Sequence, residues 1–568
     1  MPDTESRRWW ALGALSLSVL VVALDLFVLT LALPTLSVDL HASSSDLQWF
    51  VDAYSLVLAA ALLPAGLLGD RIGRKKILVG ALGLFGISSL ACAYSTSSGE
   101  LIAARAVLGL AAAVIFPMAL AVLPVLFTPA ERGRAIAAVG GATFLGYPIG
   151  PILGGWLLDH FWWGSVFLIN VPVVVLAIIA VVTLLPESKG AGRFRLDGVG
   201  IGISSAGLVL LTFGLIKAGE AGWSDATAVA TMAAGAVVLV AFAAWERRAA
   251  ASYARGAKTL PLVDLGLFGS AGFTWGTLLS TLVSFALFGL VFALPQYFLD
   301  VRGFDSLGSG IRMLPMIGGL AIGLAIGQRL QTPRTRKAAA GQPETPGVPA
   351  VPAVAAAPAA PPVSPKIMIA IGFAIMAIGL GIGTGTHLGS GTGFAAAWVA
   401  VTGFGLGMAM PTALNVALGA LSAERSGSGS ALITAMRQVG GTIGVAVLGT
   451  VLSTVYRGGL HLTGLPAQAT AAIKSSVAAG VATAKAARSG SLLDLVRTSY
   501  VHGLDVMLWV CAGIALASAL LALAFLPRWQ APGPDSADPL PADAATVSEG
   551  TPGPADATIA SAGSVRAE

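Results

Sequence analysis

The stretch Gly66–Leu78, GLLGDRIGRKKIL, joins two long apolar runs near the N-terminus of the chain. Its basic residues are typical of a loop on the cytoplasmic side of a membrane. Such a loop needs neither the acid Asp70 nor the glycines Gly69 and Gly73, so charge alone explains only part of the pattern. The stretch therefore predicts a membrane protein in which this loop also makes a specific contact.

Apolar runs of this kind recur along the whole chain. Of the 568 residues, 56% are hydrophobic and 11% are charged. Each run of roughly 20 residues is long enough to cross about 30 Å of hydrocarbon as a helix. The sequence therefore predicts an all-α polytopic membrane protein with fourteen transmembrane helices. The expected spans are 9–33, 47–69, 77–95, 101–126, 136–156, 165–185, 198–217, 226–245, 271–298, 309–330, 367–386, 393–416, 429–454 and 503–526.

Basic residues alternate between the two sides of these spans. Loops after even-numbered spans carry clusters such as the one in 71–76, whereas the short loops after odd-numbered spans carry little beyond Lys217 and Arg302. Because basic loops stay inside, we expect a multi-pass protein of the cytoplasmic membrane with both termini in the cytoplasm and segment 456–500 outside. The first run is too long for a signal-peptide core. The net charge of +5 reflects this topology, and we expect no nucleic-acid partner.

The two halves of the chain resemble one another. Ala32-Leu33-Pro34 at the end of the first span recurs as Ala293-Leu294-Pro295 in the ninth. Spans 1–6 thus correspond to spans 9–14, and we expect two six-helix bundles related by an axis along the membrane normal, with two central spans inserted between them. The expected segments are an N-terminal bundle at 1–190, two inserted spans at 191–260, a C-terminal bundle at 261–526 with a disordered Pro/Ala-rich cytoplasmic linker at 332–365, and a disordered cytoplasmic tail at 527–568.

Ionisable residues within the spans are few, and a charge at membrane depth costs at least about 2.5–3.5 kcal/mol. Asp25, Asp52 and Arg105 lie in spans 1, 2 and 4. Burial favours the neutral form of a carboxyl group and a nearby arginine favours its charged form, so an aspartate with a movable cation partner can load and release protons. We expect the three residues to face one cavity and to couple transport to protons. The alternative is a static Asp–Arg brace.

The loop that follows span 2 is expected to hold the cytoplasmic side shut. Helix N-termini favour anions because their N–H groups are free, and the small residues of 427–430 at the start of span 13 would let Asp70 approach one. The corresponding segment of the second half, 327–329, lacks the acid, so one strong latch is expected. The residues of the latch motif are Gly66, Asp70, Arg71, Gly73 and Arg74.

A glycine strip marks span 5, where residues 146–155 read GYPIGPILGG. Glycines four residues apart leave one helix face smooth, and the proline bends the helix. Close packing without a transport role is the alternative. We expect this strip to meet the glycines 319, 323 and 327 of span 10, and span 13 to meet span 2. The motif residues are Gly146, Gly150, Pro151, Gly154 and Gly155, echoed in the second half by Arg437, Gln438, Gly440 and Gly444.

These segments carry a resemblance to known transporters. The loop 66–78 resembles the signature of the major facilitator superfamily, and 146–155 resembles the antiporter motif of its drug/proton exporters. Segments 24–34 and 47–59 are similar to the first two spans of the fourteen-span drug:proton antiporters of QacA/EmrB type, with departures at Phe27 and Thr30. Further matches are Arg105-x3-Gly109, Phe167–Pro172 and Arg437–Gly441. The resemblance implies the facilitator fold and export driven by the proton gradient without a cofactor.

The resemblance favours efflux of small lipophilic, often cationic compounds by a secondary transporter that works as a monomer in the lipid bilayer. Spans 10 and 12 lack the acid that some members use for dications. Alternatives are a dedicated exporter of an endogenous metabolite or lipid and, more remotely, a transport-inactive scaffold or receptor. The sequence contains no metal cluster, catalytic nucleophile with a base, or nucleotide-binding loop, which argues against an enzyme. The expected substrate-lining residues are Phe27, Tyr54, Phe116, Phe144, Tyr147, Phe288 and Phe292.

Overall fold

The computed structural model describes residues 4–42, 44–189, 197–255, 261–331, 363–421, 426–462 and 465–527. Secondary structure within these ranges is helical, without strands, which confirms the predicted all-α fold. The predicted linker and tail fall almost entirely outside them.

The first half of the molecule consists of the helices up to residue 184. They are α1 (Thr4–Asp39), α2 (Ser44–Ile72), α3 (Arg74–Ala93), α4 (Ser98–Leu126), α5 (Pro129–His160), α6 (Ser165–Leu168) and α7 (Asn170–Leu184). The short α6 and α7 together form the sixth span. The inserted hairpin is α8 (Gly198–Ala221) and α9 (Ala226–Ala254).

The second half begins with the short helix η1 (Leu265–Gly269). It continues with α10 (Ala271–Gln296), η2 (Tyr297–Val301), α11 (Ser306–Gln331), α12 (Pro365–Gly383), α13 (Thr392–Gly419), α14 (Ser426–Gly459), α15 (Ala467–Ser475), α16 (Val477–Ala486) and α17 (Gly490–Phe525). Thirteen helical segments among the described residues are long and apolar enough to cross a membrane. The remaining predicted span, 136–156, lies within α5.

Two hydrophobic cores hold the helices together. One is built mainly from α1–α7 and the other from α10–α17. The first core also takes in residues from α13 and α14, among them Leu414, Leu418 and Ile433. The exact domain boundaries stay a prediction, but the two cores show where the apolar faces of the helices meet.

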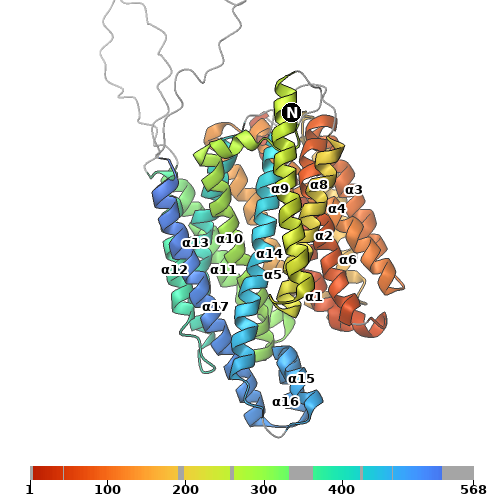
Figure 1. The fold of residues 1–568 in the computed structure, drawn as a ribbon, viewed down its shortest axis with the longest axis vertical. Helices are drawn as coiled ribbons and strands as arrows, with labels where there is room; N and C mark the ends of the chain where they lie inside the picture. The colour runs from red at the N-terminus through yellow and green to blue at the C-terminus, as the bar shows by residue number, and fades with distance from the viewer. Residues whose placement is uncertain are drawn as a thin grey trace, which may run out of the picture.

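The inserted hairpin lies beside the seam between the halves (Figure 1). Ser205 Oγ of α8 donates to the Ala60 carbonyl of α2 at 2.7 Å, and Trp223 Nε1, in the turn after α8, donates to Thr450 Oγ1 of α14 at 2.9 Å. Only 17% of the most apolar stretch of α9 is buried. The α8 helix thus contacts both halves, while α9 forms part of the outer surface.

The glycine strips face other helices than expected. The helices do pair as predicted, α5 with α11 and α2 with α14. A Cβ on Gly146, however, would lie 2.5 Å from Ala23 Cβ of α1, so this glycine packs within the first half. Likewise Gly323 packs on the Phe404 carbonyl of α13, and Gly444 on that of Phe285 of α10. The prediction that smooth faces meet across the seam is therefore wrong for Gly146, Gly323 and Gly444, which serve packing within each half.

The segment expected as a long outer loop is largely helical. It contains α15 and α16, and α17 begins at Gly490 rather than near 503. The additional turns of α17 bury Leu492, Val496 and Tyr500, which lie about one helical turn apart. These turns precede the apolar run 503–526. A search for continuous apolar runs therefore does not detect them.

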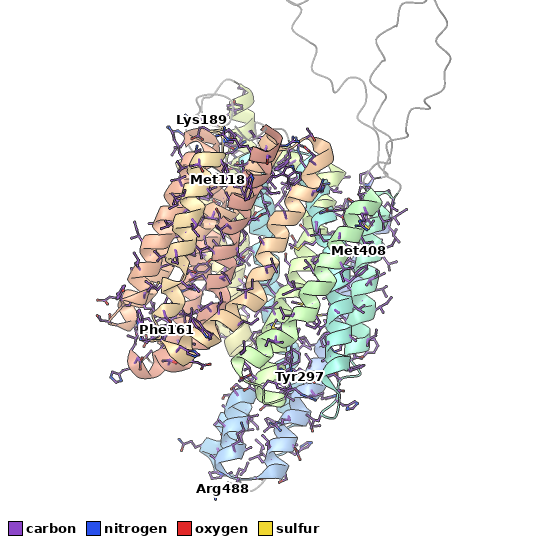
Figure 2. All side chains as sticks on the ribbon, turned by 180° about the vertical axis from the view of Figure 1, so that it is seen from behind. Met118, Phe161, Lys189, Tyr297, Met408 and Arg488 are labelled. Atoms are coloured by element: carbon purple, nitrogen blue, oxygen red, sulfur yellow. The ribbon has the colours of Figure 1, made fainter. Side chains whose placement is uncertain are left out.

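The molecule is closed at one end and hollow at the other. Lys189 and Arg488 mark the two ends (Figure 2), and the chain begins at the Lys189 end (Figure 1), here called the N-terminal side. On that side Ser430 Oγ of α14 donates to the Pro117 carbonyl of α4 at 3.2 Å, near the place where α13 and α14 join the first core. The central pocket and the outer vestibule described below lie toward the opposite side, which bears α15 and α16.

Candidate functional site

A buried ion pair lies at the centre of the first half. Arg105 Nη1 of α4 donates to Asp25 Oδ2 of α1 at 2.5 Å, and each side chain is only 1% exposed. An ion pair so far from water is stable only if its other polar atoms are also satisfied. The structure therefore brings together two of the three residues that the sequence singled out for proton coupling.

Arg105 has two further contacts that do not depend on Asp25. Its Nε donates to the Phe50 carbonyl of α2 at 2.9 Å, and its guanidinium lies 4.5 Å from the centre of the Tyr54 ring. Gly109, one turn further along α4, allows this approach, because a Cβ there would lie 2.3 Å from the Tyr54 carbonyl. Tyr54 is fully buried beneath Arg105, so it lies beside the ion pair and is absent from the linings of the central pocket and vestibule described below.

Asn170 is a member of this site that sequence reasoning missed. Its Nδ2 donates to Asp25 Oδ1 at 3.0 Å and lies 3.3 Å from Ser89 Oγ of α3. Asn170 begins α7, directly after the break that separates it from α6, and is 1% exposed. The signal was present, because Asn170 is the polar residue of the sixth-span motif 167–172. An amide adds no charge, however, and so it escaped a search for ionisable groups.

A central pocket of about 490 Å³ separates the two halves on the open side. Asp52 lines it, together with the predicted residues Phe288 and Phe292 and with Gln438 of the second-half motif. Ile216 of the inserted hairpin also contributes to the wall, which the sequence did not suggest. Further lining residues are Leu26, Val51, Ser55, Val291, Pro295, Gln296, Leu299, Ser309, Met313, Thr442 and Val445.

Asp52 and the ion pair occupy different surroundings. Asp25 and Arg105 are almost completely buried inside the first half, whereas Asp52 is part of the pocket wall. Leu26, the neighbour of Asp25 in α1, is also part of that wall. The structure thus places the ion pair directly behind the pocket rather than in one cavity with Asp52.

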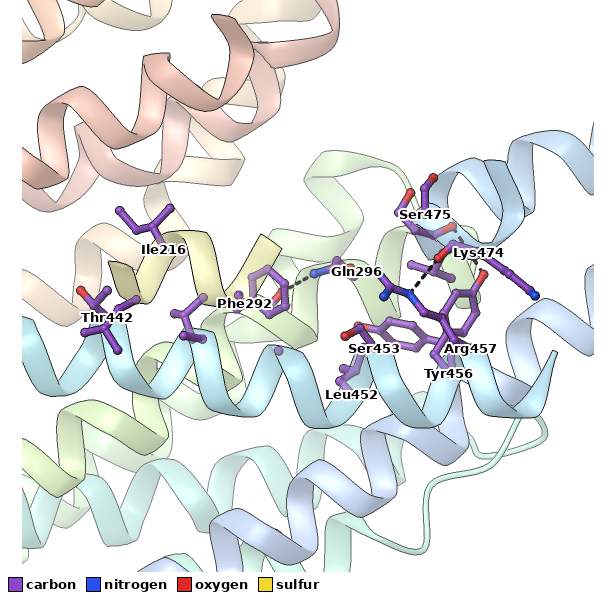
Figure 3. A pocket seen from close by; sticks show the side chains of 18 of the residues that line it. Ile216, Phe292, Gln296, Thr442, Leu452, Ser453, Tyr456, Arg457, Lys474 and Ser475 are labelled. Carbon is purple, nitrogen blue, oxygen red and sulfur yellow. Dashed lines mark hydrogen bonds between the residues drawn. The ribbon is translucent and has the colours of Figure 1, made fainter. Parts of the chain in front are cut away.

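An outer vestibule continues from the central pocket toward α15 and α16 (Figure 3). The two cavities share six lining residues: Asp52, Ile216, Phe292, Gln296, Thr442 and Val445. Arg457 Nε donates to the Lys474 carbonyl at 3.1 Å, and Tyr456 Oη donates to the Ile473 carbonyl at 2.8 Å, so α15 is fixed to the end of α14. A solute leaving the central pocket would pass the basic residues Arg457 and Lys474.

The predicted latch loop has a defined geometry on the N-terminal side. Arg74 Nη2 donates to Asp70 Oδ1 at 2.8 Å, and the two side chains are nearly buried. Gly73 adopts φ +126°, a conformation that favours glycine, and Lys75 Nζ donates to the Val182 carbonyl of α7 at 2.7 Å. Gly66 is buried and Arg71 exposed. Docking of Asp70 on the start of α14 stays a prediction, because the side chains of 427 and 428 lie outside the described residues.

We expect Asp70→Asn to loosen the closed end, because Arg74 then loses its buried anionic partner. A cysteine at Thr143 reports this, since Thr143 lines a small cavity between the halves with Phe116 and Arg437. In the Asp70→Asn background, Thr143→Cys should react faster with a membrane-impermeant thiol reagent applied from the N-terminal side. Glu187→Gln, which neutralises an exposed carboxylate of the same region, should leave the rate unchanged. Equal rates in all three backgrounds argue against the latch.

Arg437 of α14 is the charged residue of the second-half motif. Its Nε donates to Ser284 Oγ of α10 at 3.3 Å, and its side chain lines the small cavity together with Phe116. Gly440 lies against Thr281 of α10. The side chains of Phe27, Phe144, Tyr147 and Pro151 lie outside the described residues, so their predicted roles stay predictions, as do those of Gly150, Gly154 and Gly155.

Comparison with known proteins agrees with this geometry. The profile of the Major Facilitator Superfamily matches residues 15–445. The chain is 31% identical over 527 residues to the multidrug efflux pump LfrA of Mycolicibacterium smegmatis, covering 91% of this chain and 96% of that protein. It is 30% identical over 557 residues to the tetracenomycin C resistance and export protein of Streptomyces glaucescens, covering 96% of each. The human organic anion transporter MFSD10 superposes with a TM-score of 0.55 at 13% identity, covering 92% of this chain and 100% of that one, a likeness of fold alone.

Proposed function

This chain belongs to the major facilitator superfamily, and from that premise we propose that it exports small lipophilic drugs or antibiotics in exchange for protons. The observation that carries the proposal is the central pocket between the halves. Its volume of about 490 Å³ lies within the range of small-molecule sites, and apolar and aromatic side chains surround a single carboxylate, Asp52. Such a lining favours amphipathic molecules, and the negative charge of Asp52 in the wall would attract a cationic group.

The ion pair behind the pocket provides a route for coupling. When Asp25 takes up a proton, its charge attraction for Arg105 is lost, while the Phe50 carbonyl and the Tyr54 ring still hold the guanidinium. Proton uptake can then free α1 from α4 without expelling Arg105 into the lipid. Because Leu26 of α1 lines the pocket, movement of α1 alters the substrate site. No cofactor is needed, since the proton gradient supplies the free energy.

The setting of the protein follows from the same proposal. We place it in the cytoplasmic membrane as a monomer, with both termini and the closed end in the cytoplasm. The structure then represents an outward-open state, and the vestibule beside α15 is the exit. Rocking of the halves would close this side and open the other, with the inserted α8 moving along the seam.

A drug-susceptibility panel in a pump-deficient host tests this function. Cells that produce the protein should tolerate at least about fourfold more of one or more lipophilic antibiotics or toxic cations. Asp52→Asn should remove the tolerance toward cations and preserve that toward neutral compounds, because it removes the single carboxylate of the pocket. Asp225→Asn is the control, because it replaces a helix cap that lines neither the pocket nor the vestibule by another good cap. No change in tolerance to any compound would contradict multidrug export.

Dedicated export of an endogenous metabolite is the second candidate. It is favoured by the 30% identity, over nearly the full length of both proteins, to the tetracenomycin C resistance and export protein. Deletion of the gene in its own host distinguishes the two functions. A dedicated exporter should leave one metabolite inside the deletion strain, whereas a multidrug exporter should mainly lower tolerance to added compounds.

A further inference from the structure

Two buried carboxyl groups lie at the end of the inserted hairpin, far from the ion pair of the first half. Asp197 is the N-cap of α8 and is 4% exposed, and Glu246, near the end of α9, is fully buried. Nothing in the proposed transport cycle uses either residue. Their burial at the junction where the hairpin leads into the second half calls for a separate account.

Hydrogen bonds satisfy three of the four carboxyl oxygens. Asp197 Oδ1 accepts from the Gly200 N–H at 2.9 Å, and Oδ2 accepts from Trp245 Nε1 at 2.6 Å. Glu246 Oε2 accepts from the Val263 N–H at 3.0 Å. Glu246 Oε1 is buried and has no donor. A buried oxygen without a hydrogen-bond donor costs free energy. One donor hydrogen is therefore missing beside Glu246 Oε1.

The unpaired oxygen lies near the other carboxyl group. A Cβ built on Gly200 would lie 2.6 Å from Asp197 Oδ2 and 2.9 Å from Glu246 Oε1, so both oxygens flank the same small space. Two ionised carboxylates would repel one another there. One proton on the pair removes a charge and supplies the missing donor, because a protonated carboxyl group carries an O–H.

We propose that Asp197 and Glu246 together bind one proton, held on Glu246 Oε1 and donated to Asp197 Oδ2. The proton comes from water at the N-terminal side and returns there on release. Glu246 also holds the backbone of Val263, which belongs to the segment that joins the hairpin to α10. Loss of the proton would set two carboxylates against each other and loosen this segment. The pair is thus a second protonation site, which connects the hairpin to the second half.

Among the described residues, no charged group near the pair supplies the missing donor. Arg247 and Arg248 follow Glu246 on α9 and are exposed. Asp264, on the next segment, accepts from the Gly266 N–H at 2.9 Å and adds no positive charge. The basic residues Arg193, Arg195 and Lys258 of the adjoining loops lie outside the described residues. The proposed proton supplies this donor by joining Glu246 to Asp197.

Trp245 provides an optical probe of this proton, because its indole donates directly to Asp197. Its emission is obtained as the difference between the purified protein and Trp245→Phe. We expect one titration step between about pH 4 and pH 9, the range open to a buried carboxyl pair. The step should be lost in Glu246→Gln, which retains the size of the side chain but takes up no proton. The capping variant Asp225→Asn, at the other end of the hairpin, should retain the step.

A flat Trp245 signal in the wild-type protein overturns the proposal, as does a step that persists unchanged in Glu246→Gln. If that variant does not fold, Asp197→Asn provides the same comparison, since Asn also caps helices. The measurement needs no substrate. Its result is therefore independent of whether the protein exports drugs.

Discussion

We expect Asp25→Asn to abolish the proposed proton-driven export while the protein still inserts into the membrane. Asparagine has the shape of the aspartate but takes up no proton, so an imposed pH gradient can no longer act through this position. In everted vesicles that contain the variant, a fluorescent lipophilic substrate should not accumulate when the gradient is applied. Wild-type vesicles should accumulate it, and an ionophore that collapses the gradient should reverse this.

The variant also removes the anion that neutralises Arg105, and breaking one side of a buried pair typically costs about 3–5 kcal/mol. A folding defect could therefore imitate a coupling defect. Asp25→Asn combined with Arg105→Gln removes both charges and should restore the yield of folded protein without restoring gradient-driven accumulation. Undiminished gradient-driven export by either variant is incompatible with proton coupling through Asp25.

Replacement of Gly146 by leucine should have the second largest effect. A Cβ at Gly146 would lie 2.5 Å from Ala23 Cβ and 3.0 Å from the backbone carbon of the same residue. Overpacking ordinarily costs about 1–3 kcal/mol, and here a contacting backbone atom cannot turn aside. The displaced helix is α1, which carries Asp25 two residues further along. We expect export to fall at least about tenfold, which corresponds to about 1.4 kcal/mol.

Gly141→Leu is the matched control on the same helix. A Cβ at Gly141 meets no atom within 4 Å, so a leucine can be accommodated there. Both variants should be compared by surface expression and by initial rate of substrate efflux from loaded cells. Equal rates for the two variants would show that the contact between α1 and α5 does not matter for transport.

The fold and the ionisable residues of the site were predictable because each leaves a strong physical signal. Runs of apolar residues long enough to span a bilayer have few alternatives, and a charge within one stands out because of its cost. Asp25 and Arg105 were recognised in this way, and they form a pair. Asn170 donates a hydrogen bond to Asp25. Because an amide costs less to bury than a charge, the sequence did not mark Asn170 as a member of the site.

The spacing of the glycines did not predict which neighbouring helix each glycine face contacts. Glycines four residues apart show that a helix has a smooth face, but they do not say which neighbour uses it. The strip of α11 meets α13 and Gly146 meets α1, because close packing within each half takes up these faces. Tyr54 was expected in the substrate pocket for the same reason, since its aromatic character did not reveal that Arg105 lies over its ring.

Exchange of protons for substrate through Asp25 is tested most directly with the purified protein in proteoliposomes that enclose a pH-sensitive dye. A gradient of a transported compound is imposed across the membrane without any initial pH difference. Coupled exchange predicts that protons move opposite to the compound in the wild-type protein, and that this flux is absent in Asp25→Asn/Arg105→Gln. Transport of the compound by the wild-type protein with no proton flux, or an equal flux in the double variant, would contradict it.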